Sequence, residues 1–277
     1  MKEQFLNFYH FEEPMSKKEK IDTIVSILDM MDSSEVDDYL QNISKKYFLI
    51  QLSKYIPNHD LPEYDSKEFQ FLILLHKYNG IVVRKIFRAE GFSDYLIKKL
   101  SKMYQLDEVD NGIYIFPDSS LDQEFILQNK FSKAVISHET ALYHHDLTDV
   151  IPKKIYVSLP KNYNLSQIYK THHSNSKLLD GIEFINNNPI MKKDKTNMLS
   201  MNNNPIIVTS AERTIADVLK RGHRTEIEII EQAILKYLNN ANSRLIRLRR
   251  VSKEQNTLVE LDKMIDTLRI KGAVPNE

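Results

Sequence analysis

The sequence predicts an α+β fold in three parts, and three observations indicate it. Apolar residues at helical spacing dominate residues 1–62, and three short helices followed by a hairpin fit residues 63–118. Residues 119–277 alternate short apolar strands with helices that gather toward the C-terminus. A chain of 277 residues typically holds more than one domain. We therefore expect a helical extension, a small helix-and-hairpin domain and a mixed C-terminal domain with these boundaries.

The composition limits the classes of protein to consider. The chain has no cysteine, which excludes disulfides, thiol nucleophiles and thiolate metal sites. No stretch approaches the roughly 18 apolar residues of a membrane span, and the first residues lack the apolar centre of a signal peptide. We therefore expect a cytoplasmic protein that does not contact a membrane.

Charge is spread unevenly along a chain that is neutral overall. Residues 1–65 carry seven basic and thirteen acidic side chains, whereas residues 119–277 carry 23 basic and 18 acidic ones. An acidic beginning and a basic end permit nucleic-acid contact through local patches.

The first part is predicted to be a pair of amphipathic helices. Ser16 and Glu19 form a capping-box pattern, and apolar residues recur at helical spacing over residues 21–28. A second run with the same spacing covers residues 36–50, and two prolines within residues 56–65 indicate a linker. Apolar stripes of this kind favour a helical module packed on its own chain over a dimerisation or partner-docking arm.

The second part is predicted to begin with three short helices. Ser66 and Ser93 are the expected N-caps of the first and third helices. Asn79-Gly80 supplies the left-handed end of the first helix, and Gly91 supplies the tight turn between the second and third.

A hairpin is predicted directly after these helices. Residues 106–109 pair with residues 113–116 across Asp110-Asn111-Gly112, because Asn-Gly is a strong hairpin signal. Three helices, a glycine turn and a hairpin in this order are typical of a winged helix-turn-helix that binds DNA.

The third helix is the expected DNA-reading element. Leu96, Leu100 and Met103 are expected to face the core, while the opposite face offers donors to phosphates and base edges. The predicted DNA-binding residues of the helices and the wing are Arg84, Lys85, Arg88, Ser93, Tyr95, Lys98, Lys99, Lys102 and Asn111. The alternatives are a lysine row that is only solvated, and a winged helix used for protein contact.

The third part is organised around a predicted strand–helix–strand unit. Residues 134–136 form a short apolar strand, and Ser137 is placed to cap the helix that follows. Within residues 154–159, Ile155, Val157 and Leu159 alternate with Tyr156 and Ser158, which is the period-two pattern of a half-buried strand.

Further elements are predicted on both sides of this unit. Apolar residues within 119–130 suggest a buried bridging segment, and Thr209 with Glu212 forms a second capping box at the start of a helix. The remaining predictions are a strand at 182–185, a hairpin of 198–201 with 205–208, and helices over about 225–239, 242–251 and 255–270.

Two segments carry a family resemblance. The stretch SHETALYHHDLTDVIP followed by VSLPKNYN, and later TSAERTIADVLK, resemble the AbiEi-type antitoxins of type IV toxin–antitoxin (abortive-infection) systems. The resemblance implies a winged helix that binds inverted repeats in double-stranded promoter DNA of its own operon. It also implies a C-terminal domain that neutralises a cognate nucleotidyltransferase-like toxin without a stable complex. The acidic wing residues Asp107, Glu108 and Asp110 differ from the basic wing common in that family.

Polar clusters give little support for catalysis. His138, His144 and His145 lack the i, i+4 spacing of a metal-binding pair, so we expect no metal or cofactor. We expect instead that the histidines at the helix end are exposed to solvent or hydrogen-bonded to the backbone. Arg213 and Asp217 have the spacing of an ordinary helical ion pair, with the neighbouring Glu212 used as a cap. The sequence contains no Gly-rich phosphate loop, nucleophile elbow or paired-carboxylate nuclease motif.

A second basic surface is predicted near the C-terminus. Residues 191–253 carry thirteen basic and six acidic side chains, and Arg244, Arg247 and Arg250 are its expected centre. Arginine forks suit phosphate and carboxylate alike, so this surface either extends a DNA footprint, meets an acidic partner such as the N-terminal segment, or is only solvated.

The expected function is that of an AbiEi-like antitoxin and transcriptional autorepressor, not an enzyme. The alternative is a winged-helix regulator with a ligand- or protein-binding C-terminal domain and no toxin partner. A nuclease is a third and more remote interpretation.

Overall fold

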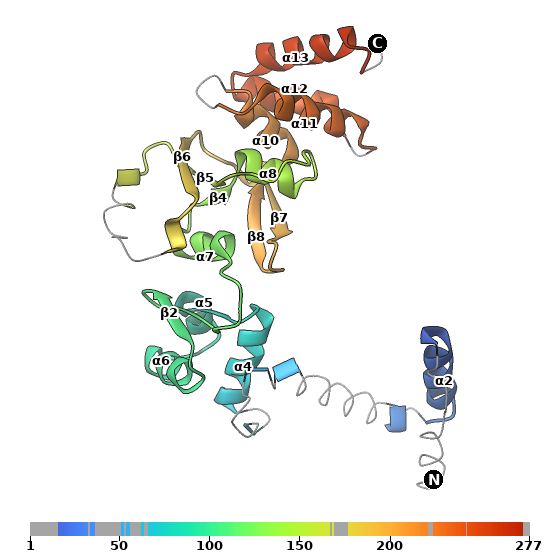
Figure 1. Cartoon of the computed structure of the whole chain (residues 1–277), viewed down its shortest axis with the longest axis vertical. Coiled ribbons are helices and arrows are strands. Elements are labelled where there is room, and N and C mark those ends of the chain that lie inside the picture. The colour runs from blue at the N-terminus through green and yellow to red at the C-terminus, as the bar shows by residue number, and fades with distance from the viewer. Residues whose placement is uncertain are drawn as a thin grey trace. The chain divides into compact units, whose positions relative to one another are not determined.

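The computed structural model describes residues 16–32, 34–36, 51–52, 54–55, 62–63, 66–166, 168, 177–220, 224–241 and 243–273. By its internal contacts the chain divides into two compact units, Met1–Pro62 and Glu63–Glu277, and Figure 1 labels most of their elements. None of the helices in the described part of the chain has the length and hydropathy that a membrane span requires.

The first unit contains helix α2 (Lys17–Asp29), which begins at the predicted capping box. The backbone N–H of Glu19 donates to Ser16 Oγ at 3.3 Å, and the N–H of Ser16 donates to Glu19 Oε2 at 2.7 Å. The reciprocal bonds confirm the start of this helix. The predicted second helix over 36–50 and the predicted linker over 56–65 lie almost entirely outside the described residues.

The second unit opens with the predicted helices and hairpin, in the predicted order. Ser66 and Ser93 each accept a backbone N–H at a helix start, and Gly80 and Gly91 adopt a φ of +84° at the turns, so these four predictions are confirmed. The sheet has the antiparallel order β1-β3-β2. The elements are α4 (Lys67–Lys77), β1 (Ile81–Val83), α5 (Arg84–Ala89), α6 (Asp94–Met103), β2 (Asp107–Asp110) and β3 (Ile113–Ile115).

An aromatic core holds α6 in place, and it corrects one prediction. Ile97 and Leu100 are buried, whereas Met103 is 39% exposed. The buried stripe continues to Tyr104, which stacks on Phe71 with ring centroids 6.2 Å apart. The prediction that Met103 faces the core is therefore wrong, because a stripe through Ile97 and Tyr104 turns the helix so that Met103 points outward.

The bridging segment joins this region to the sheet that follows. Helix α7 (Gln123–Lys130) buries Phe125, Ile126 and Leu127, as predicted. Phe125 stacks on Tyr78 at the end of α4, with centroids 5.4 Å apart. The Asn79 side-chain amide donates to the carbonyl oxygen of Asn202 at 2.7 Å. The two halves of the second unit therefore share one apolar core.

A five-stranded mixed sheet forms the centre of the C-terminal part. Its order is β6-β5-β4-β8-β7, with β5 parallel to β6, β4 parallel to β8, and the other neighbours antiparallel. The predicted hairpin and strand–helix–strand unit are both present. The elements are β4 (Val135–Ile136), α8 (His138–His144), β5 (Ile155–Pro160), β6 (Ile182–Asn187), β7 (Lys195–Leu199) and β8 (Pro205–Thr209).

Two predictions for the strand–helix–strand unit are wrong, the cap at Ser137 and the half-buried character of β5. Ser137 precedes α8 but makes no side-chain cap bond, because its hydroxyl accepts from Ser158 Oγ at 2.7 Å. Ser158 is fully buried between Val157 and Leu159, so β5 is not the half-buried strand that its alternation suggested. A polar side chain tolerates this burial because it is hydrogen-bonded.

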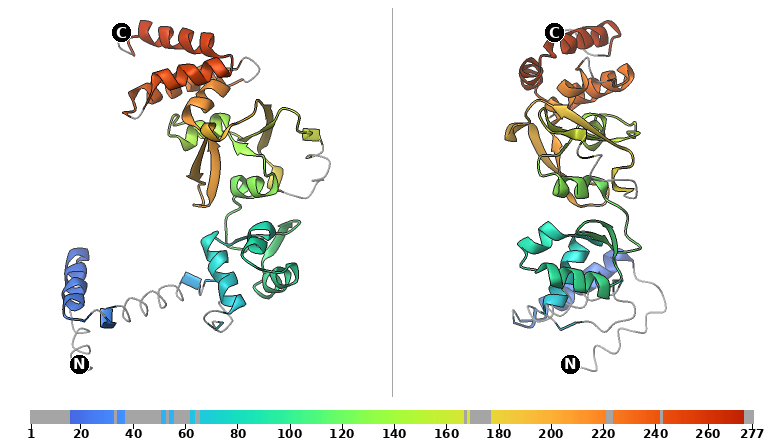
Figure 2. Two further views of the ribbon diagram at one scale, coloured as in Figure 1. Left: turned by 180° about the vertical axis from the view of Figure 1, so that it is seen from behind. Right: turned by 90° about the vertical axis from the view of Figure 1, so that its left-hand side faces the viewer.

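Helices cover one end of this sheet and form a second apolar core (Figures 1 and 2). They are α10 (Ala211–Val218), α11 (Ile227–Asn239), α12 (Leu245–Glu254) and α13 (Leu258–Ile270). The N-cap of α10 is Ser210 and not the predicted Thr209, whose hydroxyl instead lies 2.7 Å from that of Thr214. The described residues form two sheets, and helices gather at the C-terminal end, so the α+β class is confirmed.

Candidate nucleic-acid interface

Helix α6 presents the predicted polar face to solvent. Tyr95 is 77% exposed, and Lys98, Lys99 and Lys102 are exposed beside it. Among the described residues, none of these lysines forms an ion pair. Because the opposite side of α6 is buried in the aromatic core, this face is rigidly held and its charges are free to meet phosphates or base edges.

A basic groove lies between α5, the tip of the β2–β3 hairpin and α7. Its volume is about 420 Å³. It brings together predicted residues from α5 and the wing, and it adds Asn129 and Lys130 of α7, which sequence reasoning missed. Nothing in the sequence around 129–130 indicates that α7 packs beside the wing. The groove is lined by Val83, Arg84, Lys85, Arg88, Asn111, Gly112, Ile113, Asn129 and Lys130.

The two arginines of the groove are held by internal partners. The Arg88 guanidinium donates through Nε and Nη2 to both carboxylate oxygens of Asp94, at the start of α6. Arg84 donates to the amide oxygen of Asn111, and its Nη1 lies 4.0 Å from Asp94 Oδ2. The hydrogen bond from Arg88 lowers the pKa of Asp94 below its ordinary value, because it stabilises the ionised carboxylate.

The acidic residues of the wing are partly used within the fold. Asp110 pairs with Lys130, and both side chains are largely buried. Glu108 accepts the backbone N–H of Gly112 at 3.3 Å, which braces the turn. Asp107 is exposed. The wing therefore carries less free negative charge than its composition suggests.

The predicted C-terminal basic surface is only partly paired with acids of its own chain. Arg247 Nε lies 3.2 Å from Glu212 Oε1, and Arg249 Nε lies 3.2 Å from Asp262 Oδ1. Arg244 precedes α12 as its N-cap residue, and Arg250 is exposed with no ion pair among the described residues. Glu212 also accepts from the Tyr237 hydroxyl at 3.1 Å, so the prediction that Glu212 is only a helix cap is wrong.

A buried polar network lies beneath α10, and sequence reasoning misjudged it. Arg213 and Asp217 are both fully buried, so they are not the ordinary surface pair that their spacing suggested. Asp217 also accepts from Lys220 Nζ at 2.6 Å and from Asn187 Nδ2 at 2.9 Å. Burial opposes ionisation of Asp217, but the positive charges of Arg213 and Lys220 outweigh it and lower the pKa of the carboxyl group.

The network continues through strand β5 to α8. Asn187 Nδ2 donates to Ser158 Oγ at 3.1 Å, Ser158 Oγ donates to Ser137 Oγ, and Ser137 Oγ lies 2.9 Å from His138 Nδ1. Ser137, Ser158 and Asp217 are fully buried, and His138 is nearly so. A hydrogen-bonded chain with no exposed member specifies the packing of the sheet against α8 and α10.

His144 and His145, the other two histidines considered as metal ligands, also have hydrogen-bond partners within the fold. His144 Nε2 lies 2.9 Å from Glu124 Oε2, and His145 Nε2 donates to the Thr209 carbonyl at 2.6 Å. The expectation of a solvent-exposed pair is therefore wrong for His144, whereas His145 has the predicted backbone partner. No group of three potential metal ligands occurs among the residues that the structure describes.

Neither the models of known protein families nor the curated proteins give a match to this chain. The candidate function therefore depends on the geometry of the described residues and on the motifs of the sequence.

Proposed function

We propose that this protein binds double-stranded DNA, with α6 in the major groove and the α5–wing groove on the flanking phosphates. The observation that carries the proposal is the row of unpaired lysines Lys98, Lys99 and Lys102 beside Tyr95, on a helix whose other side is buried. Lysine and tyrosine donors on such a helix suit phosphate oxygens and base edges.

We further propose that the protein is an AbiEi-like antitoxin that represses its own operon. The support is the order of the two resembling segments behind the winged helix. In the structure those segments form α8, β5 and α10, which the buried network of Arg213 and Asp217 joins. The toxin partner would be a nucleotidyltransferase-like protein, neutralised without a stable complex.

A gel-shift titration tests DNA binding. The purified chain is titrated onto its own upstream DNA, and onto a random duplex of equal length, at two salt concentrations. We expect tighter binding to the upstream DNA and a loss of affinity with salt, because phosphate contacts release counterions. Equal affinity for both duplexes would contradict the proposed promoter recognition.

Co-expression tests the antitoxin activity. The chain is expressed together with a nucleotidyltransferase-like toxin encoded beside it, and we expect growth to be restored. A variant with Lys98→Ala and Lys102→Ala serves as a control, because loss of DNA binding separates repression from neutralisation. Failure of the wild-type chain to restore growth would contradict the antitoxin role and leave the DNA-binding role standing.

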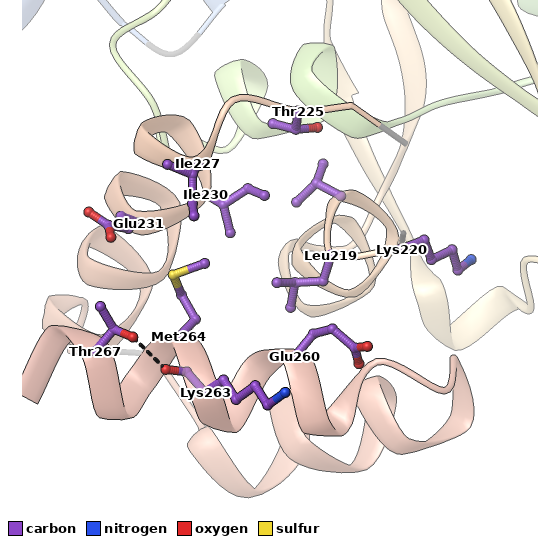
Figure 3. Close-up of a pocket in the computed structure, with 11 residues that line it drawn as sticks. Leu219, Lys220, Thr225, Ile227, Ile230, Glu231, Glu260, Lys263, Met264 and Thr267 are labelled. Carbon is purple, nitrogen blue, oxygen red and sulfur yellow. Dashed lines mark hydrogen bonds between the residues drawn. The ribbon is translucent and has the colours of Figure 1, made fainter. Parts of the chain in front are cut away.

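One observation favours the alternative of a ligand-responsive regulator. A pocket of about 430 Å³ lies between α10, α11 and α13, a size suited to a small molecule. Figure 3 shows Leu219, Ile230 and Met264 pointing into it, with Lys263 on α13 at its edge. A small molecule that raises the melting temperature and changes DNA affinity, in a chain that does not neutralise the toxin, would favour this alternative.

A further inference from the structure

The carboxylate of Asp94 lies beside two of the cations that line the α5–wing groove, Arg84 and Arg88. It accepts two hydrogen bonds from the Arg88 guanidinium, and Arg84 Nη1 lies 4.0 Å from it. Side-chain exposure is 47% for Asp94, 56% for Arg88 and 33% for Arg84, so an external anion can reach both arginines.

The same guanidinium geometry suits a phosphate. Arginine binds carboxylate and phosphate alike through two parallel N–H···O bonds, so one anion can replace the other in the fork. Asp94 is the first residue of α6, the helix proposed to read DNA, and Arg88 belongs to α5. Replacement of the Asp94 carboxylate by a DNA phosphate at the Arg88 guanidinium would therefore link contact with the DNA backbone to the helix proposed to read DNA.

No second acid competes for these arginines among the described residues that line the groove. Asp110, beside the groove, pairs with Lys130, and Lys85 is exposed with no described ion pair. The remaining lining groups are amides, backbone and apolar side chains. Among the described residues, Asp94 is the acid whose carboxylate lies within 4.0 Å of both Arg84 and Arg88.

We propose that Asp94 is an internal mimic of a DNA phosphate, which competes with the DNA backbone for Arg88 and Arg84 and so limits affinity. This inference rests on the proposed DNA binding. When DNA binds, Arg88 leaves Asp94 and pairs with a phosphate. The contact then contributes less to the binding free energy, because the pair between Arg88 and Asp94 is lost. A repressor with such a built-in competitor releases DNA more readily than its basic residues alone would allow.

The test compares Asp94→Asn with Asp118→Asn on one random duplex across a salt series. Asp118 is exposed and outside the groove, so both substitutions remove one negative charge from the same region. We expect Asp94→Asn to bind about threefold to tenfold tighter than Asp118→Asn at moderate salt, with a salt slope steeper by about one unit for the phosphate gained. Thermal melting of both variants, and of Asp94→Ser as a second neutral substitution, checks that each is folded.

A second comparison assigns the gain to the arginine. Adding Asp94→Asn to a chain that carries both Arg84→Ala and Arg88→Ala should give little or no further gain in DNA affinity, because both guanidinium groups that Asp94 would release are absent. A gain that persists without these two arginines, or an Asp94→Asn affinity no higher than that of Asp118→Asn, would overturn the inference while wild-type binding upholds DNA recognition. No binding by any variant, the wild type included, would overturn both.

Discussion

Arg213 and Asp217 form a completely buried ion pair, with Arg213 Nε 3.0 Å from each carboxylate oxygen of Asp217. The guanidinium also donates to the carbonyl oxygens of Pro189 and Asn188, both at 3.2 Å. One arginine therefore ties α10 to the loop after β6. A buried ion pair gives little net stability compared with apolar residues in its place. Removing one partner is nevertheless costly, because the remaining charge stays buried away from water without its partner.

Asp217→Asn should therefore lower the free energy of unfolding by about 3 kcal/mol, the lower end of the cost of breaking a buried pair. The buried Arg213 would lose its hydrogen-bonded counterion and keep the more distant Asp194, whose Oδ2 lies 3.7 Å from Arg213 Nη1. Urea denaturation measures this loss. Asp262→Asn, which removes the exposed partner of Arg249, is the matched control and should cost less than about 1 kcal/mol. Equal effects of the two substitutions would show that the network contributes no more than a surface pair.

The stability of the fold should also fall as the solution is acidified through the histidine range. Burial lowers the pKa of His145 below its ordinary value of 6.5, although its bond to the Thr209 carbonyl acts in the opposite direction. The unfolded chain then binds a proton at a pH where the folded chain does not, so stability is lost as pH falls through 6.5 toward the folded pKa.

Unfolding measured in urea between about pH 7.5 and 5.5, where carboxylates stay ionised, follows the titration of the histidines, and comparison with a His145 variant isolates the contribution of His145. His145→Gln keeps a donor for the Thr209 carbonyl but cannot be protonated, so the variant should lose less stability than the wild type across that range. Parallel pH dependences for the two proteins would exclude His145 as the cause.

Local chemistry explains which elements could be predicted from the sequence. The serine caps at Ser66 and Ser93 and the left-handed turns at Gly80 and Gly91 satisfy backbone groups within a few residues, so short patterns specify them. The cap of α10 was displaced by one residue because Thr209 and Ser210 offer the same hydroxyl chemistry.

Long-range pairing explains what the sequence could not predict. An arginine and an aspartate four residues apart have the same sequence spacing in an exposed helix and in a buried one. The burial of Arg213 therefore could not be predicted from that spacing. Charge counting likewise could not find that Arg247 meets Glu212, 35 positions earlier, or that Lys130 meets Asp110. The exposed face of α6 was predicted correctly because it follows from helical spacing, and its contact with DNA stays a prediction.

Gly112→Ala should disturb both the wing and the basic groove. Gly112 has a φ of +73°, and an added Cβ would collide with the Arg84 guanidinium. We expect a loss of about 1–2 kcal/mol from the left-handed backbone alone, and a weaker affinity for DNA because Arg84 is displaced. Gly181→Ala is the matched control, since Gly181 has the same φ but nothing within 4 Å of its added Cβ.

Urea denaturation and fluorescence anisotropy on a labelled duplex measure the two consequences of each glycine substitution. Both variants should lose similar stability from the backbone, but only Gly112→Ala should bind DNA more weakly. If the Gly181→Ala variant loses DNA affinity to the same extent, the effect comes from general destabilisation and not from Arg84.

Lys98→Ala and Lys102→Ala should each weaken DNA binding and flatten the dependence of log affinity on log salt by about one unit, if each ammonium neutralises one phosphate. Lys161→Ala is the control, because Lys161 is an exposed lysine in the C-terminal part, away from α6. Anisotropy titrations at four or more salt concentrations give the slopes. A reduced affinity with an unchanged slope would instead indicate that these lysines contact bases, and an effect no larger than that of Lys161→Ala would show that the α6 face is only solvated.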